Sequence, residues 1–425
     1  MVVADDLTGA NVTGVLLAGI GLRSSLILGK TVPDGCDAVL CATESRTLPP
    51  LAAYKRVLDT MRKLSGAETQ LHSKRIDSTL RGSVLAEAAA ASDALGEDRP
   101  VFIVPSFPDA GRTVVNGVVL VNGTPLDKTG AARDPLAPVK KSDIISILEG
   151  TGYPGQKANV VHIGLNAVRE KNSKKLLELY AAGGRFFSFD AETEEDIAFI
   201  ADAAIASGMK FIAADPGPFT YELARRIFPE VSAGKILLVV GSVTDLTGRQ
   251  IKTAVSELRT AWTELNMERL LDESQRKAET LRAADELQKS SSQYLLLTFD
   301  SLDPEKRLDF PMLARKTGVG TERLSAVVND AMAKVVKLVC RHTEVAALFA
   351  SGGDVAASVC KALGASGIRL VDEVMPLSAF GFLTGGEAEQ MPIITKGGLV
   401  GDDDAIVRCA HYLSRSIKIT KASSH

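Results

Sequence analysis

The sequence lacks several features that mark common classes of protein. Its 425 residues include only five cysteines, with no C-x-x-C pair, and no apolar run approaches the roughly 20 residues that span a membrane. We therefore expect free thiols in a reducing, cytoplasmic setting, without a signal peptide or membrane helix. The formal net charge of −3 gives no general attraction to nucleic acid or to anionic lipid.

Motifs of several enzyme classes are also missing. There is no G-x-x-x-x-G-K-[ST] phosphate loop, no HExxH zinc motif and no G-x-S-x-G nucleophile turn. The five histidines are scattered and predict no metal cluster. No G-x-G-x-x-G follows the first expected strand, which argues against a dinucleotide-dependent dehydrogenase of hydroxy acids.

Short apolar runs alternate with longer amphipathic segments along the whole chain. The predicted strands are Ala38–Cys41, Val101–Val104, Val160–Ile163, Phe186–Phe189, Phe211–Ala214, Ile236–Val240, Tyr294–Leu297, Val345–Ala350 and Met391–Ile394. The predicted helices include Leu51–Leu64, Val84–Leu95, Lys174–Ala182, Leu246–Leu265, Glu322–Cys340 and Val355–Leu363. This alternation indicates an α/β fold with mostly parallel sheets covered by helices.

The length of the chain exceeds what one hydrophobic core usually supports, so we expect two domains. Turn-forming residues are frequent between Asp215 and Lys235, and a strong strand begins at Ile236. We place the boundary near residue 230, which gives domains of residues 1–230 and 231–425. A turn-rich excursion from Pro105 contains two Asn-Gly pairs, which are hairpin signals, and both a structural hairpin and a substrate lid fit it.

Two carboxylates and a hydroxyl follow the first expected strand, because Val2–Ala4 leads directly into Asp5, Asp6 and Thr8. One such side chain suffices to cap the helix that follows, and this turn has three. Ligands of open α/β sheets lie at the carboxyl ends of the strands. We therefore expect part of a binding site here.

A denser polar segment runs from His72 to Ser83 and contains three cations, one carboxylate and several hydroxyls. We expect it to follow a strand and to open the helix Val84–Ala91, where cations and the helix dipole together favour an anion. Arg46, after the strand Ala38–Cys41, would add a guanidinium at the same sheet edge. Because arginine binds carboxylates through two parallel hydrogen bonds, the predicted ligand is a small hydroxylated carboxylic acid.

Two glycine-rich turns follow strands in the second half of the chain. Ser351–Asp354 (SGGD) comes after Val345–Ala350, and Thr395–Gly398 (TKGG) comes after Met391–Ile394. Glycine lets backbone N–H groups approach an anion closely, so the pair of turns predicts a nucleotide phosphate site. With an acid site in the first half, phosphoryl transfer is the most economical interpretation.

Four segments, in this order, resemble the motifs of the four-carbon acid sugar kinase family over nearly the whole chain. They are Ala4–Ala10 (ADDLTGA), Lys74–Gly82 (KRIDSTLRG), Ser351–Asp354 and Thr395–Gly398. The resemblance implies an ATP-dependent kinase that phosphorylates the terminal hydroxyl of D-threonate, D-erythronate or 3-oxo-tetronate, with Mg²⁺ as cofactor and its active site in an interdomain cleft. The TKGG form resembles the threonate kinase branch, so we expect D-threonate 4-phosphate as product. One departure is that only three residues precede Ala4, fewer than is usual in the family.

The same resemblance implies that residues 1–230 bind the acid sugar and residues 231–425 bind the nucleotide. The expected substrate-binding residues are Asp5, Arg46, Lys74, Arg75, Ile76, Asp77, Ser78, Thr79 and Arg81. The expected nucleotide-binding residues are Ser242, Gly352, Gly353, Asp354, Val355, Gly397 and Gly398.

The charges suggest how these residues would act. Asp77 or Asp5 would accept the proton of the attacking hydroxyl, a choice that the sequence leaves open. Lys396 would neutralise phosphate charge, and Asp354 would help to hold Mg²⁺. We expect the acid sugar and ATP as partners, no nucleic acid or membrane, and leave a homo-oligomer open. A sensor that binds both ligands without catalysis is the alternative function.

Overall fold

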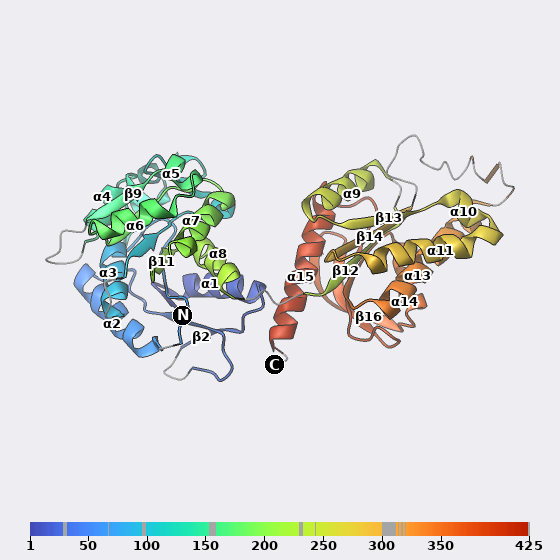
Figure 1. The fold of residues 1–425 in the computed structure, drawn as a ribbon, viewed down its shortest axis with the longest axis horizontal. Coiled ribbons are helices and arrows are strands. Elements are labelled where there is room, and N and C mark those ends of the chain that lie inside the picture. The colour runs from blue at the N-terminus through green and yellow to red at the C-terminus, as the bar shows by residue number, and fades with distance from the viewer. Residues whose placement is uncertain are drawn as a thin grey trace. The chain divides into compact units, whose positions relative to one another are not determined.

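The computed structural model describes residues 1–425 except 29–31, 67, 96–98, 153–158, 229–232, 243, 300–311, 313, 316–317, 319 and 424–425. The chain forms two compact units, Met1–Val231 and Ser232–Lys421 (Figure 1). The boundary predicted near residue 230 therefore falls among residues outside the described part. Of the described helices, none combines the length and the apolar character needed to cross a membrane.

The first unit is built on an eight-stranded parallel sheet with the order β2-β3-β1-β4-β11-β5-β10-β9. Its strands are β1 (Val2–Ala4), β2 (Ser24–Ile27), β3 (Ala38–Ala42), β4 (Ser73–Arg75), β5 (Val101–Ile103), β9 (Val160–Ile163), β10 (Phe186–Phe189) and β11 (Ile212–Asp215). Since β1 lies between β3 and β4, the carboxyl ends of these three strands meet at one edge of the sheet.

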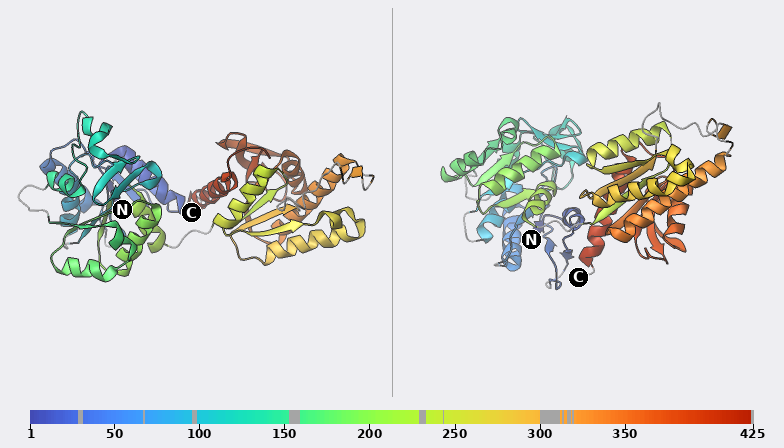
Figure 2. Two further views of the ribbon diagram at one scale, coloured as in Figure 1. Left: turned by 90° about the horizontal axis from the view of Figure 1, so that it is seen from above. Right: turned by 45° about the vertical axis from the view of Figure 1, so that its right-hand side comes forward.

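Helices cover both faces of this sheet, as Figure 2 shows. One core contains residues of α1 (Leu7–Gly19), α5 (Leu165–Arg169), α6 (Ser173–Ala181), α7 (Glu194–Ala206) and α8 (Pro218–Ile227). The other contains residues of α2 (Pro50–Leu64), α3 (Val84–Ala94) and α4 (Ile144–Gly150). Consecutive strand residues point to opposite faces, so Val2 lies in the first core and Val3 in the second. This burial on both faces explains the continuous apolar strands of the sequence.

The turn-rich excursion forms a small antiparallel sheet of β6 (Arg112–Val115), β7 (Val118–Val121) and β8 (Thr124–Pro125). Asn116 and Gly117 both have positive φ, 51° and 75°, as a tight hairpin turn requires. Val114 and Val119 are buried in the second core, which makes the excursion a structural hairpin and not a lid.

The second unit has a seven-stranded sheet with the order β13-β14-β12-β15-β18-β17-β16. Its strands are β12 (Lys235–Val240), β13 (Ala261–Leu265), β14 (Tyr294–Phe299), β15 (Val345–Ser351), β16 (Gly367–Met375), β17 (Ser378–Thr384) and β18 (Pro392–Lys396). The first five strands in this order are parallel, and β17 is antiparallel to both of its neighbours, β18 and β16. The carboxyl ends of β12, β15 and β18 are therefore neighbours.

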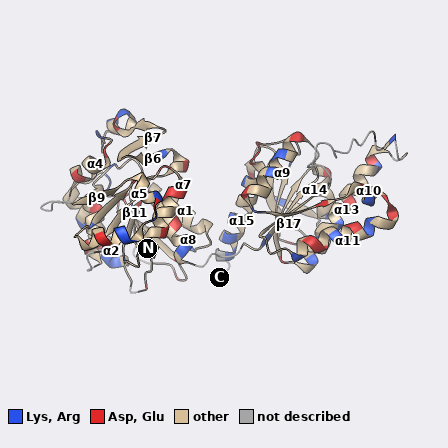
Figure 3. Cartoon of the chain, turned by 45° about the horizontal axis from the view of Figure 1, so that its top comes forward, with Lys and Arg blue, Asp and Glu red and all other residues tan. Residues whose placement is uncertain are grey.

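Two cores flank this second sheet. One includes residues of α10 (Met267–Leu271), α11 (Glu273–Lys289), α13 (Thr321–His342) and α14 (Gly353–Ala362). The other includes residues of α9 (Asp245–Glu257) and α15 (Ala405–Ser423). Acidic and basic residues are interspersed along the helices of both units, in keeping with the small net charge (Figure 3). The α/β class with mostly parallel sheets is thus confirmed.

Two sequence predictions about secondary structure are wrong. The helix predicted over Leu246–Leu265 ends at Glu257, and β13 begins at Ala261 after Arg259 turns the chain with a φ of 49°. Alternation decides this strand, because Thr263 and Leu265 are buried whereas Trp262 is exposed. The polar segment His72–Ser83 does not follow a strand either, since its own first residues form β4.

Candidate active site

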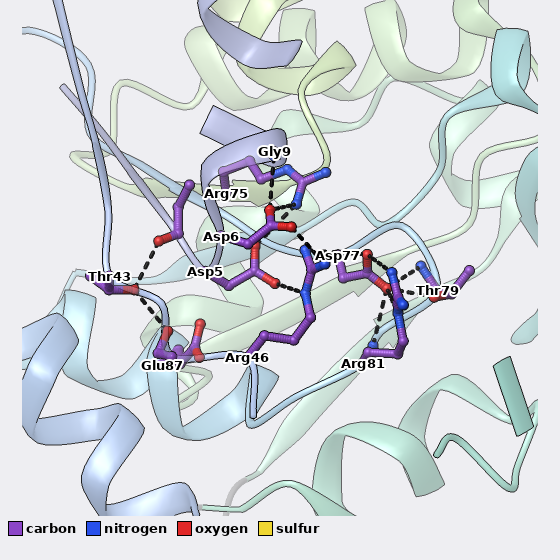
Figure 4. A network of polar contacts seen from close by, with 12 residues as sticks. Asp5, Asp6, Gly9, Thr43, Arg46, Arg75, Asp77, Thr79, Arg81 and Glu87 are labelled. Atoms are coloured by element: carbon purple, nitrogen blue, oxygen red, sulfur yellow. Dashed lines mark hydrogen bonds and ion pairs between the residues drawn. The ribbon is translucent and has the colours of Figure 1, made fainter. Parts of the chain in front are cut away.

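The turns after β3, β1 and β4 are brought together by the register of the sheet. Ala4 of β1 pairs with Ala42 of β3 and with Arg75 of β4. The three turns that follow these strands thus begin at the same level. Residues 41 and 70 positions apart in the sequence consequently meet in the polar network of Figure 4.

The two adjacent aspartates after β1 have different roles. Asp6 is the N-cap of α1, and its carboxylate accepts a hydrogen bond from the Gly9 N–H at 2.8 Å. The Asp5 side chain, 3% exposed, lies 2.7 Å from Nε of Arg46 and 3.0 Å from Nη1 of Arg75. The capping role and the binding role that the sequence allowed are thus divided between the two residues.

Arg46 is the centre of the network, because its guanidinium reaches three carboxylates. Its Nε lies 2.7 Å from Asp5, its Nη1 lies 2.7 Å from Asp6, and its Nη2 lies 3.4 Å from Asp77 (Figure 4). Burial by itself would lower the pKa of Arg46, but the hydrogen bond and charge of Asp5, with the charges of Asp77 and Asp6, raise it above its ordinary value. The group is a permanent cation that neighbouring residues hold in place.

Asp77 is held by residues of its own segment. Nε and Nη2 of Arg81 each donate to its carboxylate at 2.9 Å, and Thr79 donates through both its hydroxyl and its backbone N–H. Burial alone would raise the pKa of Asp77, yet the bonds from Arg81 and Thr79 and the charge of Arg46 hold that pKa well below its usual range. A carboxylate held in this way is ionised but is a weak proton acceptor.

Arg75 reaches the aspartates across a glycine. A Cβ atom on Gly9 would lie only 2.0 Å from Nη1 of Arg75, so any side chain at this position would displace the guanidinium. Arg75 contacts both Asp5, at 3.0 Å, and Asp6, at 3.3 Å. The absence of a side chain at Gly9 therefore leaves room for the guanidinium of Arg75 from β4.

Lys74 and Ile76 are enclosed, in contrast to their expected role as substrate ligands. The Lys74 side chain is fully buried and lies 2.7 Å from the buried carboxylate of Glu87 on α3. Ile76 is fully buried as well. The side chains of Ser78 and Thr79 are only partly buried. The side chains of Lys74 and Ile76 are therefore not accessible to a ligand at this edge.

The helix dipole predicts an anion site at the start of α3, but the structure does not present one. The N–H of Leu85 donates to the Thr151 hydroxyl at 3.2 Å, and the N–H of Ala86 donates to the Thr151 carbonyl at 3.2 Å. These amides of the first turn, which an anion would need, are already taken by a loop residue.

A cavity of about 560 Å³ lies beside Arg46. Its walls include Gly82 and Ser83 before α3, the start of α2, and residues 136–141 of a loop that carries Lys140 and Lys141. Asp134, at the start of that loop, accepts a hydrogen bond from Nη1 of Arg81 at 3.0 Å. The cavity is large enough for a small organic acid and carries a net positive lining.

In the second unit, the register again aligns the expected residues. Val240 of β12 pairs with Ser351 of β15, which pairs with Lys396 of β18. Gly398 lies against Ser242, since a Cβ atom there would be 2.8 Å from the Ser242 hydroxyl oxygen. The three turns that the sequence singled out thus form one group.

The first glycine turn has a conformation that suits glycine. Gly352 has a φ of 104°, a region that other residues rarely adopt, and its N–H donates to the Lys396 carbonyl at 3.0 Å. Val355 is buried against Gly241, where a Cβ atom would lie 2.1 Å from the valine. Val355 therefore packs against the turn after β12 and holds it close to α14, a packing role in addition to the expected nucleotide contact.

Lys396 has a different position from the one expected of a group that meets phosphate. It is 3% exposed, and its Nζ donates to the carbonyls of Gly397 at 2.8 Å and Val400 at 2.9 Å. Burial lowers the pKa of Lys396. The lysine thus holds the second glycine turn from beneath.

Asp354 is exposed in the first turn of α14 and lines a groove of about 850 Å³ between α13 and α14. Within the described part of the chain, no group of three or more His, Cys, Asp or Glu side chains could hold a metal ion. Mg²⁺ often takes one or two carboxylates and completes its shell with water and substrate phosphates. A single aspartate in the first turn of α14 is compatible with that pattern.

Sequence reasoning missed four polar residues of these sites: Glu87, Asp134, Thr247 and Gln250. Asp134 lies 53 residues from Arg81, and Thr247 and Gln250 lie about 150 residues from the loop carbonyls that they bind. No local motif marks them, because their partners are set by the packing of helices and loops.

Comparisons with known proteins agree with this arrangement. A family model described as a sugar-binding N-terminal domain matches residues 1–223, and one described as a nucleotide-binding C-terminal domain matches residues 237–406. A D-erythronate kinase of Heliobacterium modesticaldum is 38% identical over 98% of this chain and 97% of its own. A D-threonate kinase of Bordetella bronchiseptica is 32% identical over 99% of this chain and 98% of its own.

A crystal structure from Bordetella bronchiseptica, of a domain of unknown function, has a similar fold. Its TM-score is 0.66 at 30% identity, with 97% of this chain and 98% of that chain covered. That protein is a domain-swapped dimer with bound citrate.

Proposed function

This chain belongs to the four-carbon acid sugar kinase family and is a sugar-acid kinase, and we propose that it transfers the terminal phosphate of ATP to the terminal hydroxyl of D-erythronate. The 38% identity to a D-erythronate kinase over nearly the whole chain supports this acid. D-threonate, which the TKGG turn favours, is the second candidate, and D-threonate kinases are 30% and 32% identical to this chain.

The observation that carries the proposal is the position of Arg46. Arg46 lines the cavity of about 560 Å³, and its guanidinium contacts Asp5 and Asp77. A sugar acid that placed its carboxylate on Arg46 would bring its hydroxyl groups to these aspartates, which are good acceptors for hydroxyl donors. Lys140 and Lys141 would add positive charge to the same cavity.

Of the two candidate bases, we favour Asp5. Asp77 is tied through both of its carboxylate oxygens to Arg81 and Thr79 of its own segment. Asp5 is held by Arg46 and Arg75, the residues that we place around the substrate. In this proposal Asp77 accepts substrate hydroxyl bonds and orients Arg46, while Asp5 accepts the proton of the attacking hydroxyl.

The group of turns in the second unit would bind the nucleotide. Ser242, the turn Ser351–Asp354 and the turn Gly397–Asp402 place backbone amides and hydroxyls close together, as a triphosphate requires. Asp354 would hold Mg²⁺ together with the phosphates, and the ion would supply positive charge against the negative charge of the transferring group.

The test is ADP release coupled to a detection reaction, with D-erythronate, D-threonate, L-threonate and 3-oxo-tetronate as acids and with Mg²⁺ present or removed by chelation. We expect the highest kcat/KM for D-erythronate. A higher kcat/KM for another acid would show that this acid, and not D-erythronate, is the preferred substrate. Thermal shifts with ATP and an acid but no ADP release with any of them would favour the sensor function.

The crystal structure of the Bordetella relative, a domain-swapped dimer, supports a homo-oligomer for this chain as well. We propose a dimer in solution. Light scattering after size-exclusion chromatography tests this, and a mass near the 45.0 kDa of one chain would contradict it.

A further inference from the structure

The loop from Gly397 to Asp402, between β18 and α15, has its carbonyl groups bound by side chains of other elements. The buried side chain of Gln250 on α9 makes three of these bonds. Its Nε2 donates to the carbonyls of Val400 at 3.0 Å, Gly401 at 3.4 Å and Asp402 at 2.9 Å. One amide group thus fixes half of the loop.

Two other buried side chains bind the first half of the same loop. The Thr247 hydroxyl on α9 donates to the Gly398 carbonyl at 3.0 Å, and Lys396 donates to the carbonyl of Gly397. The Thr247 hydroxyl oxygen also lies 2.9 Å from the Ser242 hydroxyl oxygen, from which it can accept a hydrogen bond, so Thr247 connects the loop to the turn after β12. Thr247 is completely buried.

This pattern decides which way the amide groups of the loop point. A trans peptide unit is planar, with its C=O and the next N–H on opposite sides. Binding the carbonyls of residues 397, 398, 400 and 401 on the inner side turns the N–H groups of Gly398, Leu399, Gly401 and Asp402 to the outer side. Among the described residues, these four N–H groups donate to no acceptor within hydrogen-bond distance. Successive unpaired backbone N–H groups can form an anion-binding concavity.

The charges around the loop agree with that direction. The Asp402 side chain is 90% exposed, and Asp403 and Asp404 pair with Arg249 and Arg408. The acidic side chains that follow the loop are therefore directed to solvent or to arginines.

We propose that Thr247 and Gln250 are positioning residues for ATP: they hold the loop Gly397–Asp402 so that its outward N–H groups bind the nucleotide phosphates. This inference rests on the proposed function for its ligand, and it assigns the phosphate contact to the backbone amides and not to the charge of Lys396. Neither residue touches the nucleotide itself.

The test compares the affinity for phosphate with the affinity for the rest of the nucleotide. Thr247→Val and Gln250→Met remove the donors at similar volume, and Thr247→Ser keeps the hydroxyl. Dissociation constants of ATP, tripolyphosphate and adenosine would be measured by calorimetry or ligand-observed NMR on the full chain. Ser256→Ala, at an exposed site on α9, is the matched control.

We expect Thr247→Val and Gln250→Met each to raise the dissociation constants of ATP and tripolyphosphate by about tenfold or more. The dissociation constant of adenosine should stay unchanged, and Thr247→Ser should bind all three ligands about as well as the parent chain. The KM for ATP should rise while the KM for the acid stays constant. Equal losses for adenosine and ATP would show a general collapse of the unit, and unchanged ATP affinity would show that the loop needs no such support; either result overturns the proposal.

The proposed function and this inference fail in different ways. An absence of ADP release with every acid, in a chain that still binds tripolyphosphate through Thr247 and Gln250, would reject the kinase substrates but leave the positioning role intact. Thermal denaturation would reveal a variant that unfolds. If Gln250→Met unfolds, the ATP affinities of Thr247→Ser and Thr247→Val decide whether the positioning role holds.

Discussion

Nε of Arg46 lies 2.7 Å from the carboxylate of Asp5, and this contact joins the turn after β3 to the turn after β1. The same guanidinium also lies within 3.4 Å of Asp77, so one side chain connects three strand ends of the sheet. A residue in this position controls both the charge that a ligand meets and the orientation of the acidic groups around it.

Replacement of Arg46 by alanine should therefore affect the acid and spare the nucleotide. Removal of one partner of a buried charged contact typically costs about 2–5 kcal/mol of binding, which is roughly thirtyfold to several thousandfold in KM for the acid. The Kd of ATP should change less than twofold. Steady-state kinetics and calorimetry measure both, with the exposed Arg62→Ala on α2 as control. Parallel losses for acid and ATP would contradict the placement of the acid at Arg46.

The low pKa of Asp77 predicts a pH-dependent stability. As pH falls, the unfolded chain binds the proton first, near the ordinary pKa of 3.8, because the folded carboxylate has a lower pKa. The ionised Asp77 thus stabilises the fold above this value, and the contribution is lost as pH falls further. Asp77→Asn should lower the free energy of unfolding at neutral pH, with a difference that narrows below about pH 4. Urea titrations over this pH range test the prediction. If the difference in unfolding free energy between the parent chain and Asp77→Asn did not depend on pH, the low pKa of Asp77 would not be its cause.

Gly9→Ala should disturb the site through Arg75. The new Cβ atom would lie 2.0 Å from the Arg75 guanidinium, so the arginine must leave Asp5 and Asp6. Overpacking of this kind costs about 1–3 kcal/mol. We expect a lower melting temperature and a higher KM for the acid. Gly130→Ala, where nothing lies within 4 Å of the added atom, is the matched control and should change neither value.

Lys74 and Glu87 should behave as a structural pair. Lys74→Met leaves the Glu87 carboxylate buried without its cation, which typically costs about 3–5 kcal/mol of stability. The double variant Lys74→Met with Glu87→Leu replaces both charges by apolar groups and should recover most of the loss. Denaturant unfolding of both single variants, the double variant and the parent chain gives the coupling free energy between Lys74 and Glu87. Purely additive losses would mean that the two charges stabilise the fold independently.

The sequence predicted the framework well because buried parallel strands are apolar on both faces. Runs such as Val345–Ala350 are recognisable without any partner, and the glycine turns after them mark their carboxyl ends. From those ends alone, the grouping of Arg46 with Asp5, Arg75 and Asp77 could be expected, and the register of β1 with β3 and β4 produces it.

The parts that escaped sequence reasoning depend on contacts between distant segments. Strand β4 reads Ser-Lys-Arg, and it lies in the sheet because Lys74 finds Glu87 and Arg75 finds Asp5. A buried lysine of this kind carries no local signal that separates it from a ligand-binding lysine. The supports of the Gly397–Asp402 loop, Thr247 and Gln250, lie about 150 residues earlier and are equally silent in the sequence.

The cavity beside Arg46 has one wall built from the turns after β3 and β4 and the start of α2, and another built from the loop of residues 136–141. The first wall is constrained at Arg46, because its guanidinium is paired with Asp5, Asp6 and Asp77. The loop wall includes the exposed Leu136, Pro138 and Lys140. If this cavity receives the acid as we propose, the evolution or engineering of a kinase for longer acids would proceed by remodelling residues 136–141 while the carboxylate clamp stays unchanged.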